Sequence, residues 1–464
     1  MLPEKFIERI KNQNYIDSES LIRALNEPSP VSIRINPLKW HRKPLNSGQV
    51  PWCRNGFYLA TRPSFTLDPL FHAGCYYPQE ASSMFLEQIF RSGLISTDKI
   101  RILDLCAAPG GKATHISYLA GTESLVVAND AIGSRARLLA DNVTKWGMSN
   151  SIVTWNDPSA FGRLEGFFDV ILADVPCSGE GMFRESSVVS EWSEENAFHC
   201  SLRQKRILMD VWPALKENGI LIYCTCTFNP AENEENINWL VAKLNAEIIH
   251  PDNSAFDGIS CIGGNNPVGY GFYPGKITGE GLYISVIRKK ERTNHLSVKN
   301  RNGITVKPTK EDIKTAETWT NFRQDKIMRS GNDLFHFPGS RDDYSLLSGF
   351  LRIIKPGTKI CTLKNRDYLP SYELALSSGI KNDAFPSVEF EFDQAISFLK
   401  KEEIKNVKAS QGWFIPVYNS VNLGFVNNIG HRFNNYFPVD WRIRMSVTGD
   451  ARSKILSWED LPQI

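Results

Sequence analysis

The most regular pattern of apolar and polar positions lies in the middle third of the chain. Short apolar runs typical of buried strands alternate there with segments whose apolar residues recur at helical spacing. The runs expected to form strands are residues 100–105, 125–129, 151–155, 170–173 and 220–224. Helices are expected over 134–146 and over the segment that carries Leu202, Ile207, Leu208, Val211 and Leu215 on one face. Strands alternating with helices form right-handed βαβ units, so we expect an α/β domain with a parallel sheet.

The regions on either side of this pattern are less periodic. Alternation over residues 31–35 predicts a strand, and residues 80–91 are expected to form a helix. A charged linker is expected near 290–310, and a second charged run at 400–403 marks a break before a compact β-rich piece. A chain of 464 residues is too long for one core. We expect four parts, namely a small α+β domain at 1–95, the α/β domain at 96–290, a small intermediate α+β domain at 310–395 and a β-rich module at 396–464.

The composition is that of an ordinary globular protein. An apolar fraction of 42% and a charged fraction of 22% exclude a collagen or a coiled coil, and 11% of aromatic residues oppose long disordered stretches. No apolar window is long enough to cross a bilayer, and the charged start of the chain differs from a secretory signal, so we expect a cytoplasmic protein with no membrane partner. The formal charge of +2 permits nucleic-acid binding through local patches without requiring it. Nine cysteines, an odd number, indicate reduced thiols.

Small and acidic residues follow the expected strands at the edge where parallel sheets bind ligands. The first strand runs into Cys106-Ala107-Ala108-Pro109-Gly110-Gly111-Lys112, whose glycines let a ligand approach the backbone at the start of a helix. Asp130 follows the second strand, where a carboxylate accepts hydrogen bonds from ribose hydroxyls. Asp157 and Asp174 follow the third and fourth strands. A turn or a cap explains each feature alone, but together they predict a pocket for a nucleoside-bearing cofactor.

Two cysteines follow the fourth and fifth strands, next to this expected pocket. Cys177 lies in Asp174-Val175-Pro176-Cys177-Ser178-Gly179, and Cys226 lies in Thr225-Cys226-Thr227. C5 of cytosine is a poor nucleophile, but a thiolate that adds to C6 makes C5 able to attack a sulfonium methyl group. Such chemistry needs a thiolate beside the methyl donor and a second group that helps to reverse the addition. Inert buried thiols are one alternative, and a metal site of Cys177, Cys224 and Cys226 is another, although these cysteines lack the spacing of structural zinc ligands.

A helix is expected to begin just after Cys226. Asn229 suits the N-cap, Pro230 the first helical position and Glu232 the third. The positive end of this helix would lower the pKa of a nearby thiol. The acidic run at 232–235 would oppose that effect if it faced the thiol.

These motifs, in this order, resemble the Nop/Sun family of S-adenosylmethionine-dependent RNA cytosine-5 methyltransferases, as do residues 32–39 and 77–84 upstream. The resemblance implies a Rossmann-like class I methyltransferase sheet behind an RNA-binding-like N-terminal domain, with S-adenosyl-L-methionine as cofactor and no metal. It implies that Cys226 is the nucleophile and that Cys177 assists release of the product. It further implies that Asp174 belongs to both the catalytic and the cofactor-binding residues and contacts the target base. Asp130 would bind the ribose, Asp157 would lie near the adenine, and residues 106–112 would supply the other cofactor contacts.

The C-terminal part resembles the bacterial ribosomal RNA methyltransferase F subfamily, whose last module is a PUA-like RNA-binding domain. The segments that carry this resemblance are 364–371, 412–417 and 434–438, with Trp441, Arg442 and Arg444. Arginines interleaved with aromatic residues over 432–444 could combine phosphate contacts with base stacking, although most of these aromatic residues are expected to form the core of a small barrel. The subfamily implies structured RNA as partner, either small-subunit ribosomal RNA or a ribosomal particle, and a monomer that does not act on DNA.

One segment departs from the family pattern. The family has Arg-Phe-x-Pro-His before Gly-Glu-Gly, whereas this chain has Gly271-Phe272-Tyr273-Pro274-Gly275 before Gly279-Glu280-Gly281. The missing basic residues predict a weakened or relocated RNA contact. Three other functions remain open, namely methylation of transfer RNA, RNA binding in ribosome assembly without catalysis, and methylation of DNA through a Pro-Cys motif such as Pro176-Cys177. The Thr-Cys-Thr element and the C-terminal part oppose the DNA hypothesis.

Overall fold

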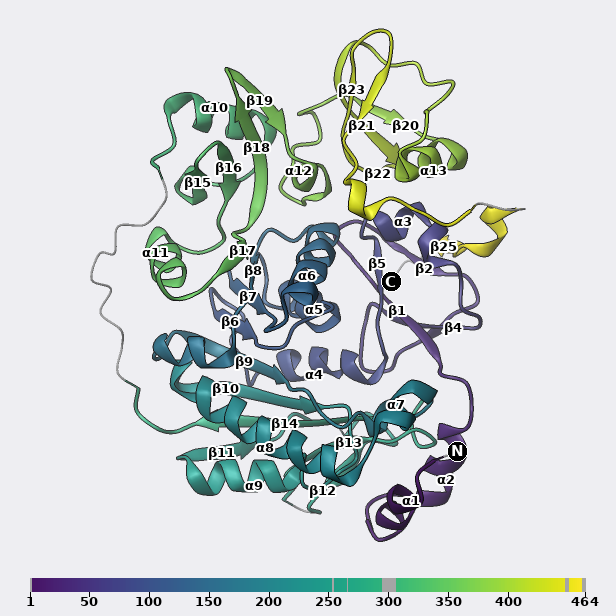
Figure 1. Ribbon diagram of the computed structural model, residues 1–464, viewed down its shortest axis with the longest axis vertical. Coiled ribbons are helices and arrows are strands. Elements are labelled where there is room, and N and C mark those ends of the chain that lie inside the picture. Colours follow the sequence, from purple (N-terminus) through teal and green to yellow (C-terminus); the bar gives the residue numbers. More distant parts are fainter. Residues whose placement is uncertain (1, 253, 265, 294–305, 447–449, 461–464) are drawn as a thin grey trace.

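One large sheet occupies the middle of the molecule, as the computed structural model shows for residues 2–252, 254–264, 266–293, 306–446 and 450–460 (Figure 1). Within these residues it has ten strands, in the order β12-β13-β14-β10-β9-β6-β7-β8-β17, with β11 also paired to β14. The strands are β6 (Arg101–Asp104), β7 (Leu125–Asn129), β8 (Ser151–Thr154), β9 (Phe168–Asp174), β10 (Leu215–Thr225), β11 (Ala246–Ile249), β12 (Ser260–Ile262), β13 (Gly269–Phe272), β14 (Leu282–Lys289) and β17 (Ile353–Lys355). The five strands from β10 to β8 are parallel, and the pairs at both edges are antiparallel. The expected α/β domain with a Rossmann-like sheet is confirmed.

Helices cover both faces of this sheet. They are α4 (Leu86–Arg91), α5 (Gly111–Leu119), α6 (Gly133–Trp146), α8 (Glu194–Val211) and α9 (Glu234–Lys243). Neighbouring residues of β6 face opposite sides, so Ile102 shares a core with Ile116 of α5 whereas Leu103 shares a core with Leu208 of α8. Because both faces are buried, the parallel strands are continuous apolar runs, and this is why the sequence identifies them.

The N-terminal part is a small α+β unit. Its elements are α1 (Glu4–Lys11), α2 (Ser18–Leu25), α3 (Pro69–His72) and the sheet β3-β4-β1-β5, made of β3 (Gly48–Gln49), β4 (Gly56–Leu59), β1 (Val31–Ile35) and β5 (Tyr76–Pro78). The strand expected over 31–35 is confirmed as β1. The helix expected over 80–91 is shorter, because the carboxylate of Glu80 accepts hydrogen bonds from the backbone N–H groups of Ser82 (2.7 Å) and Ser83 (2.9 Å). The chain therefore makes a 3₁₀ turn at Ser82–Phe85 before α4 begins.

Two further sheets lie in the C-terminal part. The first contains β15 (Ile327–Ser330), β16 (Asp333–His336), β18 (Thr358–Lys364) and β19 (Asp367–Pro370), with α10 (Lys310–Trp319), α11 (Arg341–Phe350) and α12 (Tyr372–Leu376). The second contains β20 (Ser387–Glu389), β21 (Gly412–Tyr418), β22 (Val421–Asn422), β23 (Val426–Asn428) and β24 (Phe433–Asn435), with α13 (Phe392–Lys400). The aromatic residues of this module differ in exposure, since Phe437 is buried whereas Tyr436 is exposed, and Arg432, Arg442 and Arg444 are exposed.

Segments far apart in sequence complete these units. β25 (Trp458–Asp460) pairs with β2 (Arg42–Pro44), and the ring of Trp458 lies 5.3 Å from that of Trp40. β17 pairs with β8, so the segment after residue 310 adds an edge strand to the large sheet. Most of the expected linker lies outside the described residues. Within the described part of the chain, no helix combines the length and the apolar character that crossing a membrane requires.

Candidate active site

A crevice of about 400 Å³ lies beyond the carboxyl ends of the parallel strands, where α/β sheets bind ligands. It is lined by the ends of β6, β7 and β9, by the loop after β9 and by Cys226 after β10. The predicted site residues among its lining are Cys106, Ala108, Asp130, Asp174, Cys177 and Cys226. Four separate strand ends therefore bring these side chains together, although Cys106 and Cys226 are 120 positions apart in the chain.

The loop of residues 106–112 forms one wall of the crevice and leads into α5. Gly110 has a φ of 118°, a conformation that L side chains rarely adopt, and an added Cβ would lie 3.3 Å from Cδ1 of Leu139. Two side chains of α6 hold the loop in place. Arg135 donates to the carbonyl of Ala108 (3.0 Å), and Asn142 donates to the carbonyl of Pro109 (2.8 Å). Glycine at position 110 therefore permits both the left-handed backbone turn and the close packing of the loop on α6, while Cys106 and Ala108 face the crevice.

The three predicted carboxylates differ in their placement. Asp130 is buried, caps the start of the next segment through the backbone N–H of Ile132 (2.9 Å) and lies 3.4 Å from Nε of Arg135. Asp174 is partly exposed, and its Oδ2 accepts a hydrogen bond from Nζ of Lys112 at 2.8 Å. Asp157 does not line the crevice. Its carboxylate accepts hydrogen bonds from the N–H and hydroxyl of Ser159, as an N-cap does.

The two predicted cysteines are in direct contact. Sγ of Cys177 lies 3.0 Å from Sγ of Cys226, and the backbone N–H of Cys226 also points to Sγ of Cys177 at 3.3 Å. Hydrogen bonding to Cys226, together with burial and the negative charge of Cys226, raises the pKa of Cys177 well above its usual value. Cys177 therefore holds its proton at neutral pH and can donate it to the sulfur of Cys226. The third thiol of the alternative metal site, Cys224, is fully buried within β10, and no group of metal ligands formed by these cysteines occurs among the described residues.

The expected helix start after Cys226 is wrong. Residues 230–233 form turns, and α9 begins at Glu234 with Asn233 as its N-cap. Glu232 points instead toward the Cys177 loop, where it accepts hydrogen bonds from the N–H of Ser178 (2.9 Å) and from Nε2 of Gln204 (2.9 Å). Burial raises the pKa of Glu232 to about 7, and these hydrogen bonds only partly offset the burial. No helix begins at Pro230, so the helix N-terminus that was expected to lower the thiol pKa does not lie there.

Two acidic residues of the site were missed by the sequence reasoning. Asp104, at the end of β6, is fully buried beside the crevice residues, and neither carboxylate oxygen has a hydrogen-bond partner among the described residues. Burial and the nearby Asp174 raise the pKa of Asp104 well above its usual value. Such a buried, unpartnered polar group at the cofactor loop fits a site that a polar ligand completes. The position of Asp104 at the end of β6 is the sequence feature that could have identified it as a site residue.

The second missed residue, Glu180, anchors the N-terminal helix to the site. Its fully buried carboxylate accepts hydrogen bonds from Arg9 (2.5 Å), from Trp192 (3.0 Å) and from the backbone N–H of Phe228 (3.2 Å). Arg9 lies on α1, and Phe228 lies two residues after Cys226. No local pattern could have paired residues 171 positions apart.

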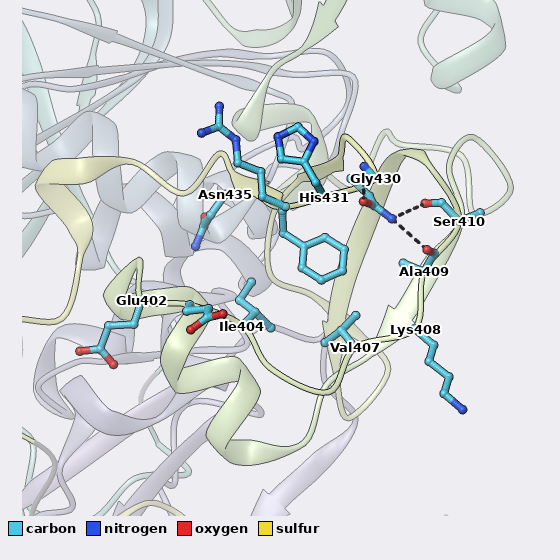
Figure 2. Close-up of a pocket in the computed structure, with 13 residues that line it drawn as sticks. Glu402, Ile404, Val407, Lys408, Ala409, Ser410, Gly430, His431 and Asn435 are labelled. Carbon is cyan, nitrogen blue, oxygen red and sulfur yellow. Dashed lines mark hydrogen bonds between the residues drawn. The ribbon is translucent and has the colours of Figure 1, made fainter.

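A larger cavity, of about 790 Å³, lies in the C-terminal module (Figure 2). It is lined by α13–β21 loop residues such as Lys408 and by residues around His431. Asn428 supports the loop by donating to the carbonyls of Ala409 (2.9 Å) and Ser410 (3.2 Å). Neither the loop at 106–112 nor a cysteine lines this cavity, so the smaller crevice is the candidate active site.

Three family models match successive parts of the chain. Residues 93–288 match the model described as 16S rRNA methyltransferase RsmB/F. Residues 2–81 match the N-terminal domain of 16S rRNA methyltransferase RsmF, and residues 385–443 match the methyltransferase RsmF PUA domain.

Individual relatives agree with these models. A protein from Aliivibrio salmonicida named ribosomal RNA small subunit methyltransferase F is 27% identical, over 94% of this chain and 97% of its own length. One of the same name from Pectobacterium carotovorum is 34% identical over 52% of this chain and 53% of its own length. Among solved structures, NSun6 from Pyrococcus horikoshii has a TM-score of 0.52 and 21% identity over 62% of this chain and 98% of its own. A methyltransferase homologue from the same organism has a TM-score of 0.50 and 26% identity over 62% of this chain and all of its own.

The fold and the site define an S-adenosyl-L-methionine-dependent RNA methyltransferase, which confirms the class and the cofactor expected from the sequence. The central part of the chain, residues 93–288, matches the RsmB/F methyltransferase family, and the parts on either side match the N-terminal and PUA domains of RsmF. The resemblance to the Nop/Sun enzymes is likewise confirmed.

Proposed function

We propose that this enzyme forms 5-methylcytosine in small-subunit ribosomal RNA, with Cys226 as nucleophile and Cys177 as the group that assists release. The observation that carries the proposal is the 3.0 Å contact between their sulfur atoms on the wall of the crevice. Methylation at an oxygen or an exocyclic nitrogen needs no thiol, whereas methylation at C5 of cytosine needs a thiolate that adds and a partner that helps it leave.

The chain's own residues account for each step of this reaction. The thiolate of Cys226 adds to C6 of the cytosine, and the electron pair of the C5–C6 double bond then forms the new bond from C5 to the methyl carbon. Bound S-adenosyl-L-methionine supplies that carbon as a sulfonium methyl group. The C5 proton then passes to solvent, the electron pair of the C5–H bond restores the C5–C6 double bond, and the sulfur of Cys226 leaves C6 as a thiolate. Sγ of Cys177 lies 3.0 Å from the sulfur of Cys226, so Cys177 can donate a hydrogen bond to this sulfur as it leaves and thereby assist the last step.

Asp174 and Lys112 have a positioning role in this scheme. A carboxylate accepts hydrogen bonds from the N4 amino group of cytosine, so Asp174 can orient the base against Cys226. The ammonium of Lys112, 2.8 Å from Oδ2, fixes the direction of this carboxylate. Asp130 is assigned to the ribose of the cofactor and Asp157 to the vicinity of its adenine. The lining of the crevice supports the first assignment, and the second stays a prediction, because Asp157 lies outside that lining.

The substrate follows from the family and from the C-terminal module. Relatives along nearly the whole chain are named for small-subunit ribosomal RNA, which favours this substrate over transfer RNA. The exposed Arg432, Arg442 and Arg444 are available for phosphate contacts. We further propose that the enzyme is a cytoplasmic monomer that acts on small-subunit ribosomal RNA or on a ribosomal particle, and that its domains divide at residues 95, 290–310 and 395.

Two cysteine variants test the proposal. With labelled S-adenosyl-L-methionine and small-subunit ribosomal RNA, Cys226→Ser should abolish methyl transfer and capture no RNA. Cys177→Ala should leave RNA covalently attached to the protein, visible as a band that resists denaturation. Cys361→Ser, at a buried cysteine of β18, is the matched control and should behave as wild type. A trapped adduct in the Cys226 variant instead would reverse the roles, and transfer to DNA in preference to RNA would refute the substrate class.

A further inference from the structure

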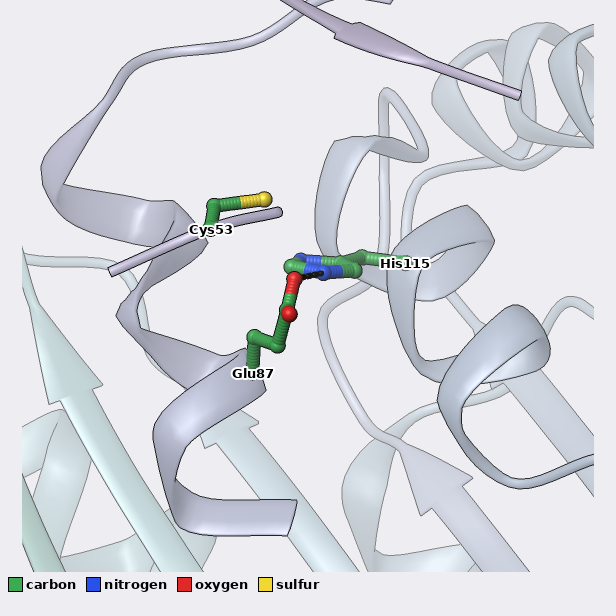
Figure 3. Close-up of side chains that lie close together, drawn as sticks. All are labelled: Cys53, Glu87 and His115. Carbon is green, nitrogen blue, oxygen red and sulfur yellow. Dashed lines mark ion pairs between the residues drawn. The ribbon is translucent and has the colours of Figure 1, made fainter. Parts of the chain in front are cut away.

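A second cluster of ligand-type side chains lies behind the active site, where the N-terminal part meets α5. Cys53 comes from the loop between β3 and β4, Glu87 from α4 and His115 from α5 (Figure 3). All three are buried, with exposed fractions of 2%, 3% and 1%. One sulfur, one carboxylate oxygen and one ring nitrogen lie within 4.8 Å of one another. Figure 3 shows the three side chains directed toward a common point from three separate segments.

The contact between His115 and Glu87 is longer than a hydrogen bond, although the carboxylate of Glu87 also accepts from the N–H of Arg54 (3.3 Å) and from Arg91 (3.2 Å). Nε2 of His115 lies 3.6 Å from Oε2 of Glu87, which is too long for a hydrogen bond. Two ligands bound to one tetrahedral zinc at about 2.0–2.1 Å would be separated by about 3.3 Å, close to this distance. Nε2 is the ring nitrogen of His115 that faces the carboxylate of Glu87.

Two arginines lie beside the cluster. The guanidinium of Arg91 lies 3.2 Å from Oε1 of Glu87, and the buried Arg34 donates to the side chains of Gln79 and Thr114. Oε2 is therefore the carboxylate oxygen of Glu87 that faces the ring of His115.

We propose that Cys53, Glu87 and His115 bind one zinc ion, a site distinct from the crevice that performs methyl transfer. A thiolate, a carboxylate and a neutral imidazole are the ligand types of zinc, whereas calcium and magnesium prefer oxygen ligands alone. The Cys53 thiol loses one proton as the sulfur–zinc bond forms, and that proton goes to solvent. Three protein ligands leave the fourth tetrahedral position to a water molecule.

The zinc would connect three segments that are separated in the sequence. α5 begins directly after the loop of residues 106–112, so a ligand at His115 links the cofactor loop to α4 and to the β3–β4 loop. An ion held here would stabilise the contact between the N-terminal part and the large sheet.

Metal content tests the proposal on the full chain. The parent for the experiment is the Cys177→Ala/Cys226→Ala variant, because it removes the two crevice thiols that could bind metal themselves. After zinc loading and extensive dialysis, elemental analysis should find about one zinc per chain. Adding Cys53→Ser or His115→Asn should lower the content at least about tenfold, whereas adding Cys75→Ser, at another buried cysteine of the N-terminal part, should not change it.

Cobalt(II) gives a second measurement that does not require the variants to fold. Cobalt added to the metal-free parent should produce a thiolate-to-cobalt charge-transfer band, and zinc should then abolish it. The proposal is overturned if the parent retains no zinc, if no such band appears, or if a folded Cys53→Ser variant keeps its zinc.

Discussion

Nζ of Lys112 lies 2.8 Å from Oδ2 of Asp174, so the end of the cofactor loop is paired with the carboxylate assigned to the target base. Lys112→Met should lower kcat/KM for RNA methylation about 100-fold, because Asp174 loses the partner that holds its direction against the cytosine. Radiolabelled methyl transfer at several RNA concentrations measures this effect.

Lys216→Met is the matched control for this variant. Lys216 pairs with Asp169 at 2.5 Å, but both residues lie at the opposite ends of β9 and β10 from the crevice. Activity should be retained there. An equal loss in both variants would mean that the effect comes from general destabilisation of the sheet.

Glu232 should make the stability of the protein depend on pH. Its pKa is about 7 in the folded protein, against 4.5 for the ordinary carboxyl, so the folded state binds the proton more tightly. The resulting stabilisation is fully present below pH 4.5 and is lost as the pH rises through about 7. Glu232→Gln removes this dependence, so the free energies of unfolding of variant and wild type should diverge by about 3 kcal/mol between pH 5 and 8, with the variant more stable at the high end.

Denaturant unfolding at a series of pH values measures the divergence. Glu235→Gln, at an exposed carboxylate three positions away, should give the pH profile of the wild type. A constant difference between Glu232→Gln and wild type at every pH would contradict the raised pKa.

Arg9→Met should destabilise the protein although α1 is near the surface. The change leaves the buried carboxylate of Glu180 without its ion pair, which costs about 3 kcal/mol in the free energy of unfolding. Calorimetric or denaturant unfolding gives the value. Lys5→Met on the same helix removes an exposed pair with Glu194 and should have no measurable effect.

Gly181 is a position where two backbones approach closely beside the cysteines. Its N–H donates to the carbonyl of Cys226 at 2.9 Å, and an added Cβ would lie 2.6 Å from the carbonyl oxygen of Gly281. Gly181→Ala should therefore displace the Cys226 segment and lower kcat about 100-fold, while the affinity for S-adenosyl-L-methionine, measured by calorimetry, stays unchanged. Gly48→Ala, whose Cβ would meet only Tyr58 at 3.8 Å, is the control.

The parts of the fold that the sequence predicts are those determined by local patterns. β7 and β8 follow from apolar runs buried on both faces, and Asp130 and Asp174 follow from their places at strand ends. The loop of residues 106–112 was recognisable because small residues and paired glycines directly after a strand are typical of a loop that a ligand approaches closely.

The parts that the sequence did not predict depend on contacts between distant segments. Asn229 and Pro230 have the propensities of a helix start, yet hydrogen bonds from Ser178 and Gln204 to Glu232 hold that segment in turns. Tertiary contacts thus override a local signal worth about 1 kcal/mol. The pairing of Arg9 with Glu180 is similarly invisible, since an arginine on a short amphipathic helix is ordinarily a solvent-exposed residue.

The antiparallel pairing of β17 with β8 has a practical consequence for anyone who truncates the chain. A fragment that stops after β14 would contain every cysteine and carboxylate of the crevice, but β8 would become the outermost strand, with its backbone N–H and C=O groups unsatisfied on one side. Exposed strand edges of this kind pair with strands of other chains. The fragment that ends after β14 should therefore self-associate as its concentration is raised. The three residues of β17 thus cover the edge of β8 and protect the sheet from aggregation.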